Sequence, residues 1–75
     1  MISEKIAAAL NDQINMEYYS AYSYLAMSAY FLTLNLNGFA HWMRIQVQEE
    51  LTHGTKVFDF LDDREGNICL EAIEA

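Results

Sequence analysis

No proline occurs anywhere in this chain, and it contains only three glycines. Because proline ends helices and glycine weakens them, little in the sequence would stop a helix once it has begun. Apolar residues spaced by three and four predict two long helices, over residues 4–34 and 38–65. Ser3 is a good N-cap for the first helix, and Gly66 is expected to end the second as its C-cap.

A single cluster of turn-forming residues, Asn35-Leu36-Asn37-Gly38, separates the two predicted helices. A turn this short joins antiparallel helices. The last segment, residues 67–75, begins with alternating apolar and polar residues, which favours an extended conformation. We therefore expect one domain over residues 1–75: an all-α, antiparallel two-helix hairpin with its turn at 35–38 and an extended tail that has little to hold it.

The chain is short for burying a core, yet 53% of its residues are hydrophobic. Its one cysteine, Cys69, excludes an internal disulfide and a closed zinc knuckle. Two helices share only one interface, but apolar residues lie on further faces of both predicted helices. These residues are Tyr19, Tyr22, Tyr30, Phe31, Val47, Leu51 and Phe58. We expect hairpins to pack against each other, at least as homodimers.

The charge of the chain is strongly negative, with eleven Asp and Glu against four Lys and Arg and a formal net charge of −7. Such a surface attracts cations and argues against nucleic-acid or anionic-membrane partners. The first residues lack the pattern of a signal peptide, and no apolar run is long enough to suggest a membrane span. A cytoplasmic protein is expected.

Polar residues interrupt the row that the second helix is expected to turn inward. This row is Met43, Gln46, Glu50, His53, Val57 and Phe60. Glu50 and His53 lie one turn apart on one face, and Glu17 stands within an apolar row of the first helix. Burying a carboxylate requires a cation or a metal ion. Because no Lys or Arg lies on either inward row, a salt bridge lacks its cation.

The three polar residues are also expected at one level of the hairpin. At 1.5 Å per residue, Glu17 lies about 25 Å from the end of the first helix, and Glu50 and His53 lie about 18 and 22 Å from the start of the second. Oxygen and nitrogen donors suit iron, manganese or zinc. We therefore expect Glu17, Glu50 and His53 to form half of a transition-metal site, with a solvated face as the alternative for an isolated Glu-x-x-His.

Four segments together resemble a known family. They are Leu10-Asn11-Asp12-Gln13-Ile14-Asn15, Glu17 with Tyr18-Tyr19-Ser20, Gly38-Phe39-Ala40-His41-Trp42-Met43, and Gln48-Glu49-Glu50-Leu51-Thr52-His53. The family is that of the non-haem ferritins of bacteria and archaea, whose N-terminal half the whole chain resembles. The resemblance implies that Glu17 is a terminal ligand of one iron, Glu50 the bridging carboxylate and His53 a ligand of the same iron. It also implies that Glu49 can hold a third iron and that Tyr24 lies beside the centre.

A ferritin subunit has two further helices that bring the ligands of the second iron, so the resemblance implies that this chain carries half of a di-iron site. Two copies related by a two-fold axis would complete a ferritin-like four-helix bundle and its six ligands. Assembly into a larger, cage-like homo-oligomer stays open. Haem-binding relatives carry a methionine directly after the bridging glutamate, and Leu51 at that position disfavours haem.

The implied function is that of a ferroxidase-type oxidoreductase, which oxidises Fe(II) to Fe(III) with O₂ or H₂O₂ for iron storage and detoxification. Tyr24 would donate an electron or a hydrogen bond, or simply pack in the core. Two alternatives remain from other classes. One is a structural hairpin, such as a fragment of a longer ferritin without a competent site. The other is a zinc or manganese site without a redox role.

Overall fold

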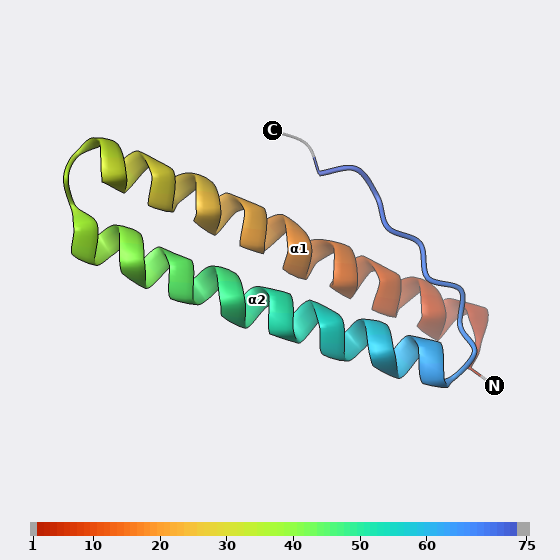
Figure 1. Cartoon of the computed structure of the whole chain (residues 1–75). Coiled ribbons are helices and arrows are strands. Elements are labelled where there is room, and N and C mark those ends of the chain that lie inside the picture. Colours follow the sequence, from red (N-terminus) through yellow and green to blue (C-terminus); the bar gives the residue numbers. More distant parts are fainter. Residues whose placement is uncertain (1, 74–75) are drawn as a thin grey trace.

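Two long antiparallel helices make up most of the computed structural model, which describes residues 2–73 (Figure 1). Helix α1 spans Glu4–Thr33 and helix α2 spans Asn37–Asp63. The tail then turns back and follows α1 (Figure 1). This is the predicted all-α hairpin. Helix α1 ends one residue before the predicted boundary and α2 ends two residues before it, and the last two residues of the predicted tail lie outside the described part.

The start of α1 has the predicted cap. The Ser3 Oγ accepts a hydrogen bond from the Ile6 backbone N–H at 3.2 Å, which satisfies a donor that the first helical turn leaves free. The residue two positions after the end of each helix lies in the left-handed region, Asn35 with φ 58° and Glu65 with φ 59°. Each allows the next N–H to bond back to a carbonyl of the last helical turn, as Gly66 does to Leu61 at 3.0 Å.

The prediction that Gly66 is the C-cap of α2 is wrong, because the left-handed position falls one residue earlier, at Glu65. Glycine is nevertheless needed at position 66 for a different reason. A Cβ atom there would overlap the side chain of Leu61, which is fully buried. The missing side chain of Gly66, rather than its conformational freedom, lets the chain turn tightly over the end of α2.

Buried residues recur every seven positions on both helices and define the interface between them. They are Ile14, Ala21 and Ser28 on α1, and Ala40, Val47, Gly54 and Leu61 on α2. Most are small, which lets the helices approach closely. The Ser28 hydroxyl donates to the Ala40 carbonyl at 2.9 Å, and a Cβ on Gly54 would come within 2.9 Å of the Tyr18 ring. Gly54 therefore makes room for Tyr18 in the middle of a helix.

The predicted inward row of α2 does not form the centre of the interface with α1. His53 is 55% exposed and Phe60 43% exposed, whereas Val47, which was expected on an outer face, is only 7% exposed. The interface instead follows the small residues Ala40 and Gly54. A search of the sequence for large apolar side chains gives such small residues too little weight. The row with Glu50 and His53 consequently lies along one flank of the interface.

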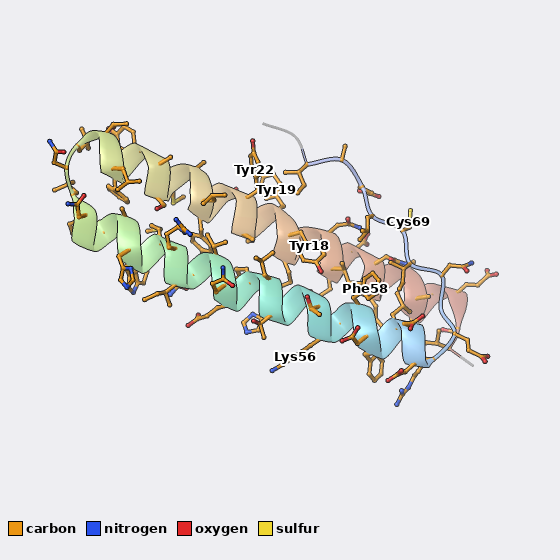
Figure 2. The ribbon with its side chains drawn as sticks, in the orientation of Figure 1. Tyr18, Tyr19, Tyr22, Lys56, Phe58 and Cys69 are labelled. Atoms are coloured by element: carbon orange, nitrogen blue, oxygen red, sulfur yellow. The ribbon has the colours of Figure 1, made fainter. Side chains whose placement is uncertain are left out.

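The other apolar residues expected on outer faces are largely accessible. Tyr19, Tyr22, Tyr30 and Leu51 are exposed, and Phe31 and Phe58 are half-buried. Figure 2 shows Tyr19 and Tyr22 projecting from α1 on the side away from α2. Neither helix, among residues 2–73, combines the length and the apolar character that a membrane span requires.

Two asparagines of α1 hold the tail, which contradicts the expectation that little would hold it. The Asn11 side chain donates to the Asn67 carbonyl at 2.7 Å and accepts from the Cys69 N–H at 2.8 Å. Asn15 repeats this pattern with the Cys69 carbonyl and the Glu71 N–H, both at 2.9 Å. Asn11 and Asn15 are four residues apart, which is about 6 Å along a helix, and two residues of an extended chain span about 6.6 Å. The spacing of the asparagines therefore matches the spacing of their partners in the tail. The tail therefore runs parallel to α1.

Candidate metal centre

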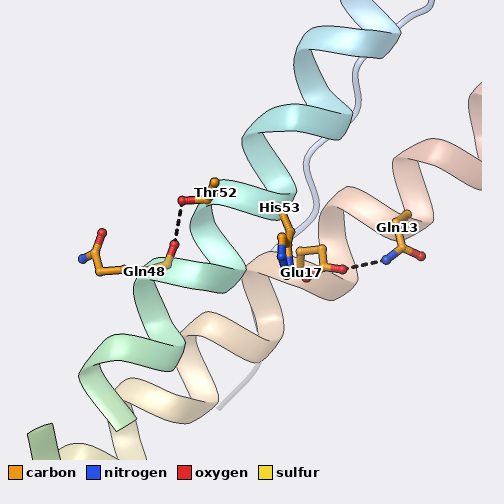
Figure 3. A network of polar contacts seen from close by, with 5 residues as sticks. All are labelled: Gln13, Glu17, Gln48, Thr52 and His53. Carbon is orange, nitrogen blue, oxygen red and sulfur yellow. Dashed lines mark hydrogen bonds and ion pairs between the residues drawn. The ribbon is translucent and has the colours of Figure 1, made fainter. Parts of the chain in front are cut away.

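Three potential ligands converge halfway along the hairpin. Glu17 from α1 and Glu50 and His53 from α2 each place one ligand atom within 4.8 Å of the other two. The Glu17 Oε2 lies 3.7 Å from the His53 Nδ1, and Figure 3 shows these two side chains next to each other. The height argument from the sequence is thus confirmed for these residues.

The fold places this group on the flank of the helix interface rather than inside it. Glu17 is 15% exposed, His53 is 55% exposed and Glu50 is half-buried. Glu50 and His53 are one turn apart, so both point to the same side of α2. The hairpin therefore supplies donors from one side, and the other side of the group stays open.

The two carboxyl groups influence each other's protonation. A hydrogen bond to Glu17 raises the pKa of Glu50 above its ordinary value, and desolvation and the negative charges of Glu17 and Glu49 act in the same direction. The same hydrogen bond lowers the pKa of Glu17, with further lowering by Gln13 and His53. The pair thus makes Glu50 the weaker acid of the two, and a bound metal cation would favour its ionised form.

Gln13 touches this group, although sequence reasoning did not single it out. Its Nε2 donates to the Glu17 Oε1 at 2.7 Å (Figure 3). The available signal was its position four residues before Glu17, on the same face of α1. Tyr18 was missed in the same way: its hydroxyl lies 3.5 Å from the Thr55 Oγ1, and the glycine in the middle of α2 was the sign that a ring packs there.

Two predicted site residues do not join the group of three found among residues 2–73. Glu49 is exposed on α2, and its contribution is a negative charge that raises the pKa of Glu50. Tyr24 is half-buried on α1, two turns beyond Glu17 and so roughly 10 Å further along the helix. The roles of Glu49 and Tyr24 stay predictions.

Residues 7–75 match the sequence profile of the ferritin-like domain. The chain belongs to the ferritin family. It is 41% identical over 75 residues to the bacterial non-heme ferritin of Staphylococcus epidermidis and 43% identical over 74 residues to that of Bacteroides fragilis. These alignments cover 100% and 99% of this chain but 45% and 46% of the two relatives. The chain thus spans about half the length of these ferritins.

Solved ferritin structures agree with this assignment. The hairpin superposes on an engineered closed form of the Archaeoglobus fulgidus ferritin with a TM-score of 0.97 and 55% sequence identity, covering 100% of this chain and 46% of that one. For the open-pore ferritin of the same hyperthermophilic archaeon, the TM-score is 0.95 and the identity 55%, over 99% of this chain and 45% of that one. The predicted family and the match to half of a ferritin chain are confirmed.

Proposed function

We propose that this member of the ferritin family binds iron and oxidises Fe(II) to Fe(III) at a di-iron centre formed between two chains, for iron storage and detoxification. The observation that carries the proposal is the convergence of Glu17, Glu50 and His53, whose ligand atoms lie within 4.8 Å of one another. Two carboxylates and an imidazole suit iron, and a chain with a net charge of −7 attracts cations.

Iron is the substrate in this proposal. Two Fe(II) ions together supply the two electrons that reduce O₂ with two protons to H₂O₂, or H₂O₂ with two protons to two waters. Glu50 binds a cation in its ionised form, and a histidine ligand such as His53 binds through a neutral ring nitrogen. Glu49 would hold a third ion, and Tyr24 would donate an electron or a hydrogen bond.

A second copy of the chain would supply the missing ligands. Related by a two-fold axis, it would bring its own Glu17, Glu50 and His53 to the open side of the group. Support comes from the flank that carries the ligands: Phe39 and Phe60 lie on the same side of α2 as His53 and are 57% and 43% exposed. A partner that covered this apolar flank would bury the polar ligands at its centre, as a buried metal site requires.

The proposed setting is the cytoplasm, and haem is not part of the proposal. Cys69 is a free, exposed thiol, which a reducing compartment would keep reduced. Leu51 follows Glu50 directly, where the haem-binding relatives carry methionine.

Aerobic addition of Fe(II) tests the function. The wild-type chain should produce ferric absorbance faster than buffer, and Glu50→Ala should reduce the rate to that of buffer because it removes the central carboxylate. Glu71→Ala, which removes an exposed carboxylate from the tail, is the matched control and should keep the wild-type rate.

Oxidation by the wild-type chain at the rate of buffer would contradict the proposal and favour the structural hairpin. Crystals grown separately with zinc and manganese would distinguish the remaining alternative. Anomalous scattering from either metal at Glu50, without any iron oxidation in solution, would indicate a site without a redox role.

A further inference from the structure

We propose that Gln13 is a positioning residue, which orients the Glu17 carboxylate so that it binds a metal ion through one oxygen only. This inference rests on the proposed function and deepens it, because it concerns how one ligand of the same centre is held. Gln13 itself would not touch the metal ion.

The geometry assigns different tasks to the two oxygens of Glu17. The Gln13 Nε2 donates to Oε1 at 2.7 Å, a short hydrogen bond to a carboxylate. The other oxygen, Oε2, lies 3.7 Å from the His53 Nδ1 and therefore faces the shared ligand group. Oε1 accepts a hydrogen bond from the Gln13 amide, and Oε2 is the oxygen nearest to His53.

A glutamate carboxylate does not hold such an orientation unaided. The terminal torsion of a glutamate side chain is broad, so the plane of the carboxylate is free to rotate. The amide of Gln13 restricts this rotation from a position one helical turn before Glu17. The Gln13 N–H occupies one lone pair of Oε1 and withdraws charge from it, which favours Oε2 as the ligand atom.

Single-oxygen binding has a consequence for the coordination of the ion. A glutamate that binds through both oxygens occupies two coordination positions, whereas Glu17 would occupy one. The coordination position that Glu17 leaves unoccupied would be free for an oxidant or for a ligand from a second chain. Hydrogen bonds that orient metal ligands in this way commonly change metal affinity by about 10- to 100-fold when they are removed.

Binding of Co²⁺ to the full chain tests the inference, because its visible absorption reports both affinity and coordination number. Gln13→Leu removes the donor and keeps much of the side-chain volume. We expect it to weaken Co²⁺ binding about tenfold and to reduce the molar absorption, as Glu17 becomes free to bind through both oxygens.

Gln48→Leu is the matched control, since it is the same substitution at an exposed position of α2. Figure 3 shows the Gln48 side chain directed away from Glu17 and His53. This variant should keep the wild-type affinity and spectrum. Circular dichroism of all variants establishes that the helices are intact.

The outcomes separate the inference from the proposed function. If Glu50→Ala abolishes Co²⁺ binding but Gln13→Leu behaves like Gln48→Leu, the positioning role is overturned and the metal site stands. A side-chain pair that merely stabilises α1 would give this result. If the wild-type chain binds no Co²⁺, or if Glu50→Ala binds it as well as the wild type, both proposals are overturned.

Discussion

Glu50 shows how a neighbouring carboxylate shapes the protonation of a single residue. Its pKa is raised by the hydrogen bond to Glu17 and by desolvation, so the folded chain holds the proton more tightly than the unfolded chain does. Above the raised pKa, the folded state must ionise Glu50 beside another carboxylate, which costs stability. Below the ordinary range of glutamate, both states are protonated and the cost disappears.

Glu50→Gln should therefore stabilise the metal-free chain at neutral pH, because it replaces the ionised group with a neutral one of the same shape. The group is partly solvated, so we expect a gain of less than about 1 kcal/mol. The gain should vanish in acid, and Glu71→Gln in the tail should change little at either pH. Urea unfolding followed by circular dichroism at both pH values measures the effect. Equal or lower stability of Glu50→Gln at neutral pH would contradict it.

The three converging residues could be predicted from the sequence because polar side chains stood out within apolar rows of known spacing. The prediction that Glu17, Glu50 and His53 converge is confirmed, and their role as metal ligands stays a prediction. The prediction that they lie on the inward faces of the helices is wrong. They lie beside the helix interface, which the small residues occupy. Gln13 was not predicted because a hydrogen-bond partner depends on side-chain rotamers, and spacing alone does not specify them.

At the scale of elements, the helices follow from the sequence and the tail only in part. Uninterrupted periodicity and one turn cluster were enough to predict α1 and α2 nearly to the residue. Alternation predicted an extended tail, but its attachment depends on Asn11 and Asn15, which had been interpreted only as part of a family motif. Two amides four residues apart on a helix can pair with alternate residues of an extended chain, and that match involves distant parts of the sequence.

Replacing both asparagines by alanine should release the tail without harming α1. Alanine is the better helix former, so the helical circular dichroism should stay the same or increase. The amide protons of Cys69 and Glu71 lose their acceptors, and each should exchange with solvent roughly two- to tenfold faster. Hydrogen exchange followed by NMR measures this. Asp12→Ala, on the neighbouring exposed position, is the control, and equal exchange in both variants would show that the asparagines do not hold the tail.

For the whole molecule, stability depends most on the balance between buried and exposed apolar residues. Among residues 2–73, the buried apolar side chains are Ile14, Ala21, Ala40, Val47 and Leu61, and two of these are alanines. Large side chains such as Trp42 and Tyr30 remain 53% and 61% exposed. A hairpin with so small a core gains stability from a partner that covers its apolar flank.

We predict a dimer at micromolar concentration, with twice the 8.6 kDa mass of one chain by sedimentation. Its melting temperature should rise with chain concentration, because association stabilises the folded state. Phe39→Glu should weaken the dimer by placing a charge on the ligand-bearing flank. Tyr22→Glu, which adds the same charge on the side of α1 away from α2, should not. A monomer at micromolar concentration would contradict both this prediction and the shared di-iron centre.

The seven-residue repeat of buried positions limits what shape such a partner can have. A straight α-helix drifts by about 20° per seven residues relative to this repeat, so helices that keep it wind around each other with a left-handed twist. Over a molecule 50 Å long, the flank with Glu17, Glu50 and His53 is then a slowly turning surface rather than a flat one. A flat partner would lose contact towards the ends of the hairpin. Another pair of helices coiled with the same hand would follow the surface along its whole length.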